Sequence, residues 1–191
     1  MSARLGQMIG LMDQYRRVWS SPITVQKKCL YMNGAVWSRG RWSLHLLHLN
    51  KALRDSLDGA QASFLRRIAK IPHPFISRVS KATTRRRCKA TRFSVQILRS
   101  QLRWLGHILR CEPTDPLRLV VFEPNTNLLP RLTGSGRKRV VGRPSIDWAQ
   151  ALIEFFCDFA RCSRQDLLLF ASDKQKYHTI VERLCSQAAL H

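Results

Sequence analysis

Apolar residues recur every three or four positions along most of the chain, and this spacing predicts a mainly helical protein. The first predicted helix ends at Pro22, and a second covers roughly residues 24–36. A long third element begins at Ser43, which is placed to cap it, and ends at Pro72. Because glycine lowers helix propensity by about 1 kcal/mol relative to alanine, Gly59 is a point at which this element would divide in two.

Residues 85–110 sort most clearly into two faces when they are projected as a single helix. One face is apolar and contains Trp104, which we expect to pack in the core. The opposite face lies within an arc of about 80° and is basic and polar. Its members are Arg85, Lys89, Arg92, Gln96, Arg99, Arg103, His107 and Arg110. His107 therefore belongs to the basic face, and the arginines are expected to be solvated and available to phosphates. Gly106 lies beside the apolar face, where its missing side chain predicts the close approach of another helix.

Prolines and glycines interrupt the helical pattern after Cys111 and predict a basic linker over residues 112–144. Its one short apolar run, "LRLVVF", has a length that suits either a helix or a strand. The linker ends in "GSGRKRVVGRPS", which is expected to be exposed and to contact nucleic acid. The basic residues assigned to that contact are Arg137, Lys138, Arg139 and Arg143.

A small helical segment is predicted at the C-terminus, over residues 145–191, with Ser145 at its start. Two further helices are predicted where a serine stands three positions before an acidic or amide residue, as in a capping box. These pairs are Ser163 with Asp166 and Ser172 with Gln175. With a helical domain over residues 1–111, the chain is expected to have three parts and a mainly α fold.

The charge of the chain is strongly positive and unevenly distributed. Lys and Arg number 33 against 12 Asp and Glu, which gives a formal net charge of +21. No acidic residue occurs between Gly59 and Cys111, whereas acids and bases nearly balance over residues 145–191. This pattern favours a nucleic-acid partner, whether RNA, DNA or a hybrid duplex, ahead of an acidic membrane. The sequence shows neither a membrane span nor a secretory signal, so we expect a nuclear protein or a cytoplasmic ribonucleoprotein that is not secreted.

No group of side chains has the spacing of a catalytic or metal site. Phosphoryl transfer with two metal ions requires clustered carboxylates, and the eight aspartates are dispersed with no two adjacent. Four zinc-binding side chains near the C-terminus are disfavoured as ligands, because cysteines five residues apart lie on different helix faces. These are Cys157, Cys162, His178 and Cys185. His45 and His48 are interpreted as a solvated pair, and Cys88 has no identifiable base despite its neighbouring arginines. We predict free thiols, no catalytic residue, no metal and no cofactor.

Four segments carry an ordered set of motifs. "ITVQKKCLYMNGAVWS" and "LDGAQASFLRRIAKI" come first, and "LRWLGHILR" and "GRKRVVGRPSIDWAQAL" follow. In order and spacing they resemble the region that follows the catalytic palm in reverse transcriptases of non-LTR retrotransposons. The resemblance covers about residues 14–150.

This resemblance implies a thumb and connector, which in that family grip the template and primer duplex beside the polymerase site. RNA-directed DNA polymerase activity would then require a palm in cis or in trans, because the chain carries neither the palm carboxylates nor the family's endonuclease. The chain alone is therefore not expected to be an enzyme. The alternative is a stand-alone basic helical protein that binds DNA or RNA, or a decayed retroelement fragment without selected activity. The preference for RNA or DNA and the oligomeric state stay open.

Overall fold

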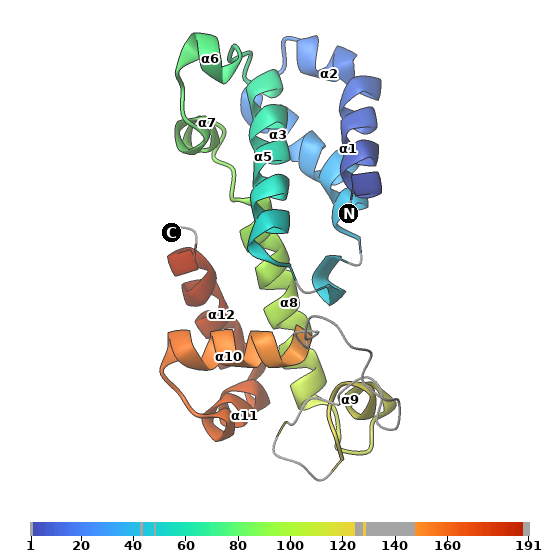
Figure 1. Ribbon diagram of the computed structural model, residues 1–191, viewed down its shortest axis with the longest axis vertical. Coiled ribbons are helices and arrows are strands. Elements are labelled where there is room, and N and C mark those ends of the chain that lie inside the picture. The colour runs from blue at the N-terminus through green and yellow to red at the C-terminus, as the bar shows by residue number, and fades with distance from the viewer. Residues whose placement is uncertain (1, 43, 48, 125–127, 129–147, 189–191) are drawn as a thin grey trace, which may run out of the picture. The chain divides into compact units, whose positions relative to one another are not determined.

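Helices make up the regular structure of the chain in the computed structural model (Figure 1). The structure describes residues 2–42, 44–47, 49–124, 128 and 148–188, and no strand occurs within these ranges. The mainly α fold that the apolar spacing predicts is therefore confirmed. None of the helices in these ranges combines the length and the apolar character that a membrane crossing requires.

The chain divides into two compact units. Unit 1 comprises Met1–Leu44 and Leu49–Ile97, and unit 2 comprises His45–His48 and Leu98–His191. The division falls inside a helix, between Ile97 and Leu98, whereas the sequence analysis ends its first domain at residue 111.

Unit 1 begins with the two helical stretches that the sequence predicts. Their elements are α1 (Ser2–Gln14), α2 (Arg16–Ser20), α3 (Val25–Tyr31), the π-helical η1 (Met32–Trp37) and α4 (Ser38–Arg41). Elements α3, η1 and α4 follow one another without a break, so the second stretch extends beyond the predicted residues 24–36. Thr24 begins it, because its side chain accepts a hydrogen bond from the backbone N–H of Lys27.

The long third element, α5 (Lys51–Ile68), begins later than predicted, after the 3-10 turn η2 (Leu44–Leu46). Its cap is Asn50, whose side chain accepts a hydrogen bond from the backbone N–H of Leu53 at 2.9 Å. The predicted cap, Ser43, lies outside the described residues. Gly59 does not interrupt α5, because burial of Leu57 and its apolar neighbours outweighs the cost of about 1 kcal/mol for a helical glycine.

The segment after α5 contains the short helix α6 (Pro74–Ser77). Lys70 and Arg78, on either side of it, adopt positive φ angles of 53° and 51°. The buried guanidinium of Arg66 holds this segment by donating to the carbonyl of Pro72 at 2.7 Å and to that of Val79. The path of the chain from α5 into the next helix is therefore fixed.

The helices α7 (Lys81–Arg87) and α8 (Phe93–Arg110) are separate, so the prediction of one helix over residues 85–110 is wrong. Lys89 lies between them with a positive φ of 49°. The cause lies in α5, where Gln61 is fully buried. Its side chain donates to the carbonyl of Thr91 at 2.7 Å and accepts from the backbone N–H of Phe93 at 3.2 Å. These bonds satisfy backbone groups that a continuous helix would pair internally.

The first turn of α8 is also fixed by a second cap and by a ring stack. The carboxylate of Asp58 accepts hydrogen bonds from the backbone N–H and the hydroxyl of Ser94, at 3.0 and 2.7 Å. Phe93 stacks on Trp37 with ring centroids 3.6 Å apart, and the Trp37 indole N–H donates to Gln96 at 2.7 Å. Both rings are buried in the core of unit 1, so this turn cannot rotate without disrupting that core.

Unit 2 contains residues 98–110 of α8 and the remaining helices. These are α9 (Pro116–Val121), α10 (Trp148–Ala160), α11 (Arg164–Ser172) and α12 (Lys174–Ala188). The run "LRLVVF" forms α9, so of the two alternatives for this run the helix is correct. Asp115 caps it by accepting a hydrogen bond from the backbone N–H of Leu117 at 2.8 Å.

One of the two predicted capping boxes is confirmed. Ser163 and Asp166 cap α11 reciprocally. Ser172 does not cap α12, because Asp173 next to it accepts hydrogen bonds from the backbone N–H groups of Gln175 and Lys176, at 2.9 and 3.1 Å. The third predicted helix start, Ser145, lies outside the described residues.

The close approach predicted at Gly106 is confirmed. A Cβ atom built on Gly106 would overlap the ring of Tyr177 on α12. Tyr177 is fully buried, its hydroxyl donates to the carbonyl of Leu102 at 2.9 Å, and its ring stacks on Phe156 of α10. The absence of a side chain at Gly106 therefore lets α12 dock on α8 through a tyrosine.

We expect Gly106→Ala to lower the melting temperature, because the new methyl group overlaps the Tyr177 ring and overpacking of this kind typically costs about 1–3 kcal/mol. Gly10→Ala is the matched control, since nothing lies within 4 Å of a Cβ at that helical position. Its gain in helix propensity should raise the melting temperature slightly. Thermal unfolding followed by circular dichroism measures both, and equal shifts would contradict the close approach.

Candidate nucleic-acid interface

In unit 1, the basic residues of α7 and of the turns on either side of it form a cluster, called here the α7 cluster, whose exposed members face solvent. Of the residues predicted here, Lys89 is exposed, and Arg85 and Arg92 are half-buried. The pKa of Arg85 is lowered first by burial and then by the charge of Arg92, with Asp58 acting in the opposite direction. The structure therefore brings Arg85 and Arg92 close enough to repel each other.

The sequence analysis missed four exposed cations of this cluster. They are Arg78, Lys81, Arg86 and Arg87. The predicted basic face assumes one helix over residues 85–110, and Arg86 and Arg87 lie off that face. Because α7 ends at Arg87, most of that projection does not apply, and the exposed side of α7 has to be found from α7 alone. The run of three arginines could have indicated the end of a helix at this point, since cations stabilise the C-terminal turn of a helix.

Two buried side chains fix the orientation of α7. Thr84 and Cys88 are buried, and the helix begins at Ser80, whose hydroxyl accepts from the backbone N–H of Thr83 at 3.0 Å. With these residues inside unit 1, Arg86 and Arg87 are held on the outside. None of the exposed cations of this cluster forms a side-chain hydrogen bond or ion pair with another described residue.

Cys88 lies in the core rather than in the basic cluster. The hydrogen bond that joins the thiols of Cys29 and Cys88 lowers the pKa of Cys88 against the effect of burial. The same bond, together with burial, raises the pKa of Cys29. The neighbouring arginines do not contribute to the shift at Cys88, and the position is suited to packing.

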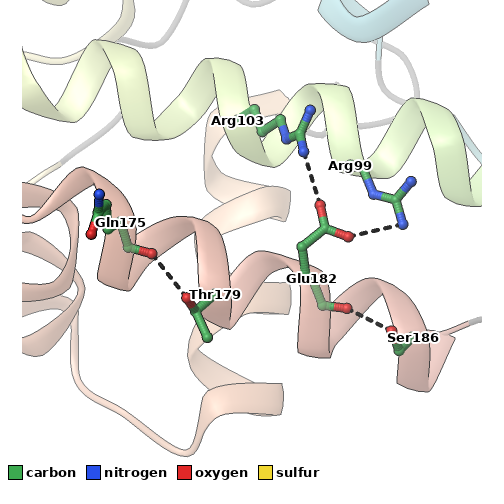
Figure 2. A network of polar contacts seen from close by, with 6 residues as sticks. All are labelled: Arg99, Arg103, Gln175, Thr179, Glu182 and Ser186. Carbon is green, nitrogen blue, oxygen red and sulfur yellow. Dashed lines mark hydrogen bonds and ion pairs between the residues drawn. The ribbon is translucent and has the colours of Figure 1, made fainter.

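In unit 2, Arg103 is exposed as predicted, whereas Arg99 and Arg110 are half-buried, and all three arginines bind other residues of this unit. Figure 2 shows Glu182 of α12 between the two arginines of α8 that it binds. Its carboxylate oxygens lie 3.0 Å from Arg99 and 2.9 Å from Arg103. Arg110 donates to the carbonyl of Ala171 at 3.2 Å. The sequence from Gly59 to Cys111 lacks acids, but α12 supplies one from far along the chain.

Trp104 and His107 lie together at the surface of unit 2. The Trp104 ring is half-buried, with the ring of His107 5.4 Å away and that of His45 6.0 Å away. Trp104 is therefore less buried than a core residue, which corrects its assignment, while His107 is exposed and belongs to the polar face as predicted.

Three cations and one acid act on His178 of α12. The pKa of His178 is lowered by burial first and then by the charges of Arg103, Lys174 and Arg110, with Glu182 opposing them. The arginines predicted in the linker, Arg137, Lys138, Arg139 and Arg143, lie outside the described residues.

The structure also bears on the side chains that the sequence analysis disfavours as metal ligands. Within the described ranges, no group of three or more His, Cys, Asp or Glu side chains is placed to hold a metal ion. The pKa of Cys157 is raised to about 11, first by burial and then by the neighbouring Cys162. All six cysteines are free thiols, as the sequence predicts.

Comparison with family models, with curated proteins and with solved structures finds no match to this chain. The likeness to non-LTR reverse transcriptases therefore remains a resemblance in the motifs, and function is inferred from the side chains and their surroundings.

We expect Glu182→Gln to strengthen nucleic-acid binding, because it releases Arg99 and Arg103 and removes a negative charge from unit 2. The slope of log K against log salt should steepen by up to about 2, and the pKa of His178 should fall further. The loss of stability should stay below about 1 kcal/mol, because the pairs are partly exposed. Salt-dependent binding isotherms and an NMR titration of His178 measure these effects.

Glu112→Gln is the charge-matched control for this variant. Glu112 is exposed and forms no side-chain ion pair with a described residue. If it steepened the salt dependence as much as Glu182→Gln, net charge rather than release of the two arginines would explain the effect.

Proposed function

We propose that this chain is a nucleic-acid-binding segment that grips a template and primer duplex, in the manner of a reverse-transcriptase thumb. The observation that carries the proposal is the exposed cluster on and beside α7, whose cations have no acidic partner among the described residues. Its members are Arg78, Lys81, Arg86, Arg87 and Lys89. Such cations bind phosphates and release counterions from a nucleic acid. The motifs that resemble the post-palm region of non-LTR reverse transcriptases supply the context of a duplex.

The form of the cluster favours nucleic acid over a membrane surface. A helix that lies in a membrane interface turns an apolar face toward the lipid. Thr84 of α7 and its cap Cys88 are instead buried within unit 1, and the residues that α7 exposes are charged apart from Ala82. A surface of this kind binds an anionic polymer without inserting into it.

The aspartates support a binding role rather than catalysis. Four of those in the described ranges cap helices, and a fifth, Asp13, pairs with Arg67. The capping residues are Asp58, Asp115, Asp166 and Asp173. RNA-directed DNA polymerase activity would thus depend on a palm in cis or in trans. The alternative function, a stand-alone basic helical binder, uses the same cluster and differs in having no palm encoded in frame upstream.

We expect the triple variant R86Q/R87Q/K89Q to weaken binding to a duplex and to reduce the salt slope by up to about 2.7, because each side chain neutralises at most one phosphate. Its melting temperature should change little, since all three side chains are exposed. Binding isotherms at several salt concentrations measure the slope.

The triple variant R16Q/R17Q/K27Q is the matched control, because it removes the same charge from exposed positions of α2 and α3. It should leave most of the binding intact. An equal loss in both triple variants would show that net charge, and not the α7 cluster, determines binding.

We expect the purified chain to incorporate no dNTP on a primed template in the presence of magnesium, because it has no paired carboxylates to hold two metal ions. A primer-extension assay tests this directly. Template-dependent extension that persists after rigorous purification would contradict the proposed role.

A further inference from the structure

A shallow groove of about 500 Å³ lies in unit 1 between α1 and the end of α4. Five side chains line it, and none of them is acidic. They are Arg4, Gln7, Ser38, Arg39 and Trp42. The groove is separate from the α7 cluster, and nothing in the sequence motifs singles it out.

The packing of α1 against α4 builds this groove. A Cβ atom on Gly40 would overlap the side chain of Met8, which is fully buried, so the two helices approach closely at that point. Arg4, one turn before Met8, donates a hydrogen bond to the backbone carbonyl of Trp42. The backbone of Trp42 is therefore held from α1 while its indole lies outside.

Trp42 differs from the other tryptophans of unit 1. Trp19 and Trp37 are buried, and their indole N–H groups donate to Met12 and Gln96, each at 2.7 Å. Trp42 is 76% exposed, and its indole N–H bonds to no described residue. A large aromatic ring left in water on a fixed backbone offers a flat face for stacking.

Cations complete the chemistry of the groove. Arg39 is exposed, and its side chain forms no hydrogen bond or ion pair with another described residue. The groove thus places an aromatic ring beside a guanidinium, and no carboxylate among the described residues lines it to compete with a ligand for that guanidinium. A ligand that joins a planar ring to an anionic group would fit both parts. A nucleobase with its phosphate has these two parts.

We propose that this groove binds an unpaired nucleobase of a single-stranded nucleic acid, with the base stacked on Trp42 and the adjacent phosphate held by Arg39. The inference rests on the proposed function, that the chain binds nucleic acid, and adds that it recognises a single strand at a second place. Paired bases are stacked inside a duplex and do not reach the indole.

The test compares three probes of about 12 nucleotides, a length within the range that single-strand sites cover. They are an oligothymidylate, an abasic oligomer of the same charge, and a duplex. Trp42→Leu should weaken oligothymidylate binding on the order of 10-fold and leave the other two unchanged. Trp42→Phe, which keeps an aromatic face, should lose much less. Arg39→Gln should reduce the salt slope for the oligothymidylate by about 0.7.

Several outcomes would overturn the inference. Unchanged oligothymidylate binding by Trp42→Leu, or an equal loss on the abasic oligomer, would exclude stacking. If Trp42→Leu lost binding only to vesicles of phosphatidylserine and phosphatidylcholine, the groove would be a membrane contact. Because Trp42 is exposed, the variants should keep the wild-type melting temperature.

The duplex probe separates this inference from the proposed function. If R86Q/R87Q/K89Q weakens duplex binding while Trp42→Leu changes nothing, the function stands and the groove assignment is wrong. If the wild-type chain binds none of the three probes in a salt-dependent manner, the proposed function fails and the groove assignment fails with it.

Discussion

The side chains of Asp58 and Gln61 on α5 hold the first turn of α8, and the placement of the basic residues in unit 1 depends on this contact. A helix start leaves backbone N–H groups without partners, and a buried one must find them elsewhere. Gln61 pairs with backbone groups of Thr91 and Phe93, and Asp58 pairs with Ser94. With these bonds made, α8 begins at Phe93 and α7 is a separate helix. The arginines of α7 therefore do not continue the basic face of α8.

Basic side chains are paired with a carboxylate in unit 2 and lack such a partner, within the described ranges, beside α7 in unit 1. Arg99 and Arg103 share one carboxylate, so two positive charges face one negative charge and a net positive charge remains. Partly exposed pairs of this kind contribute little to stability, and their main effect is on how available the guanidinium groups are. The cations beside α7 have no such partner among the described residues, so phosphates meet no competing carboxylate there.

The sequence predicts features that depend on local spacing and misses those that depend on distant residues. Gly106 is an example of the first kind, because a glycine next to an apolar face indicates close packing whichever helix arrives there. The break between α7 and α8 is an example of the second kind, because it is produced by Gln61, some thirty residues earlier. Glu182 likewise pairs with Arg103 from 79 residues away. Trp42 carries no motif, and only its exposure identifies it.

The two surfaces of unit 1 differ in the ligand that we propose for each, and their separation limits how one ligand could reach both. Within this unit α5 packs against α7 and against α1, which lies on its other side in Figure 1. The α7 cluster and the Trp42 groove therefore do not share a phosphate. A strand that leaves a duplex has the phosphates of the duplex in one region and unpaired bases in another. The separation of the two surfaces would suit such a strand. A purely single-stranded ligand would have to pass around α5 to do the same. If both proposed roles hold, a junction between duplex and single strand is therefore the ligand that would use both surfaces.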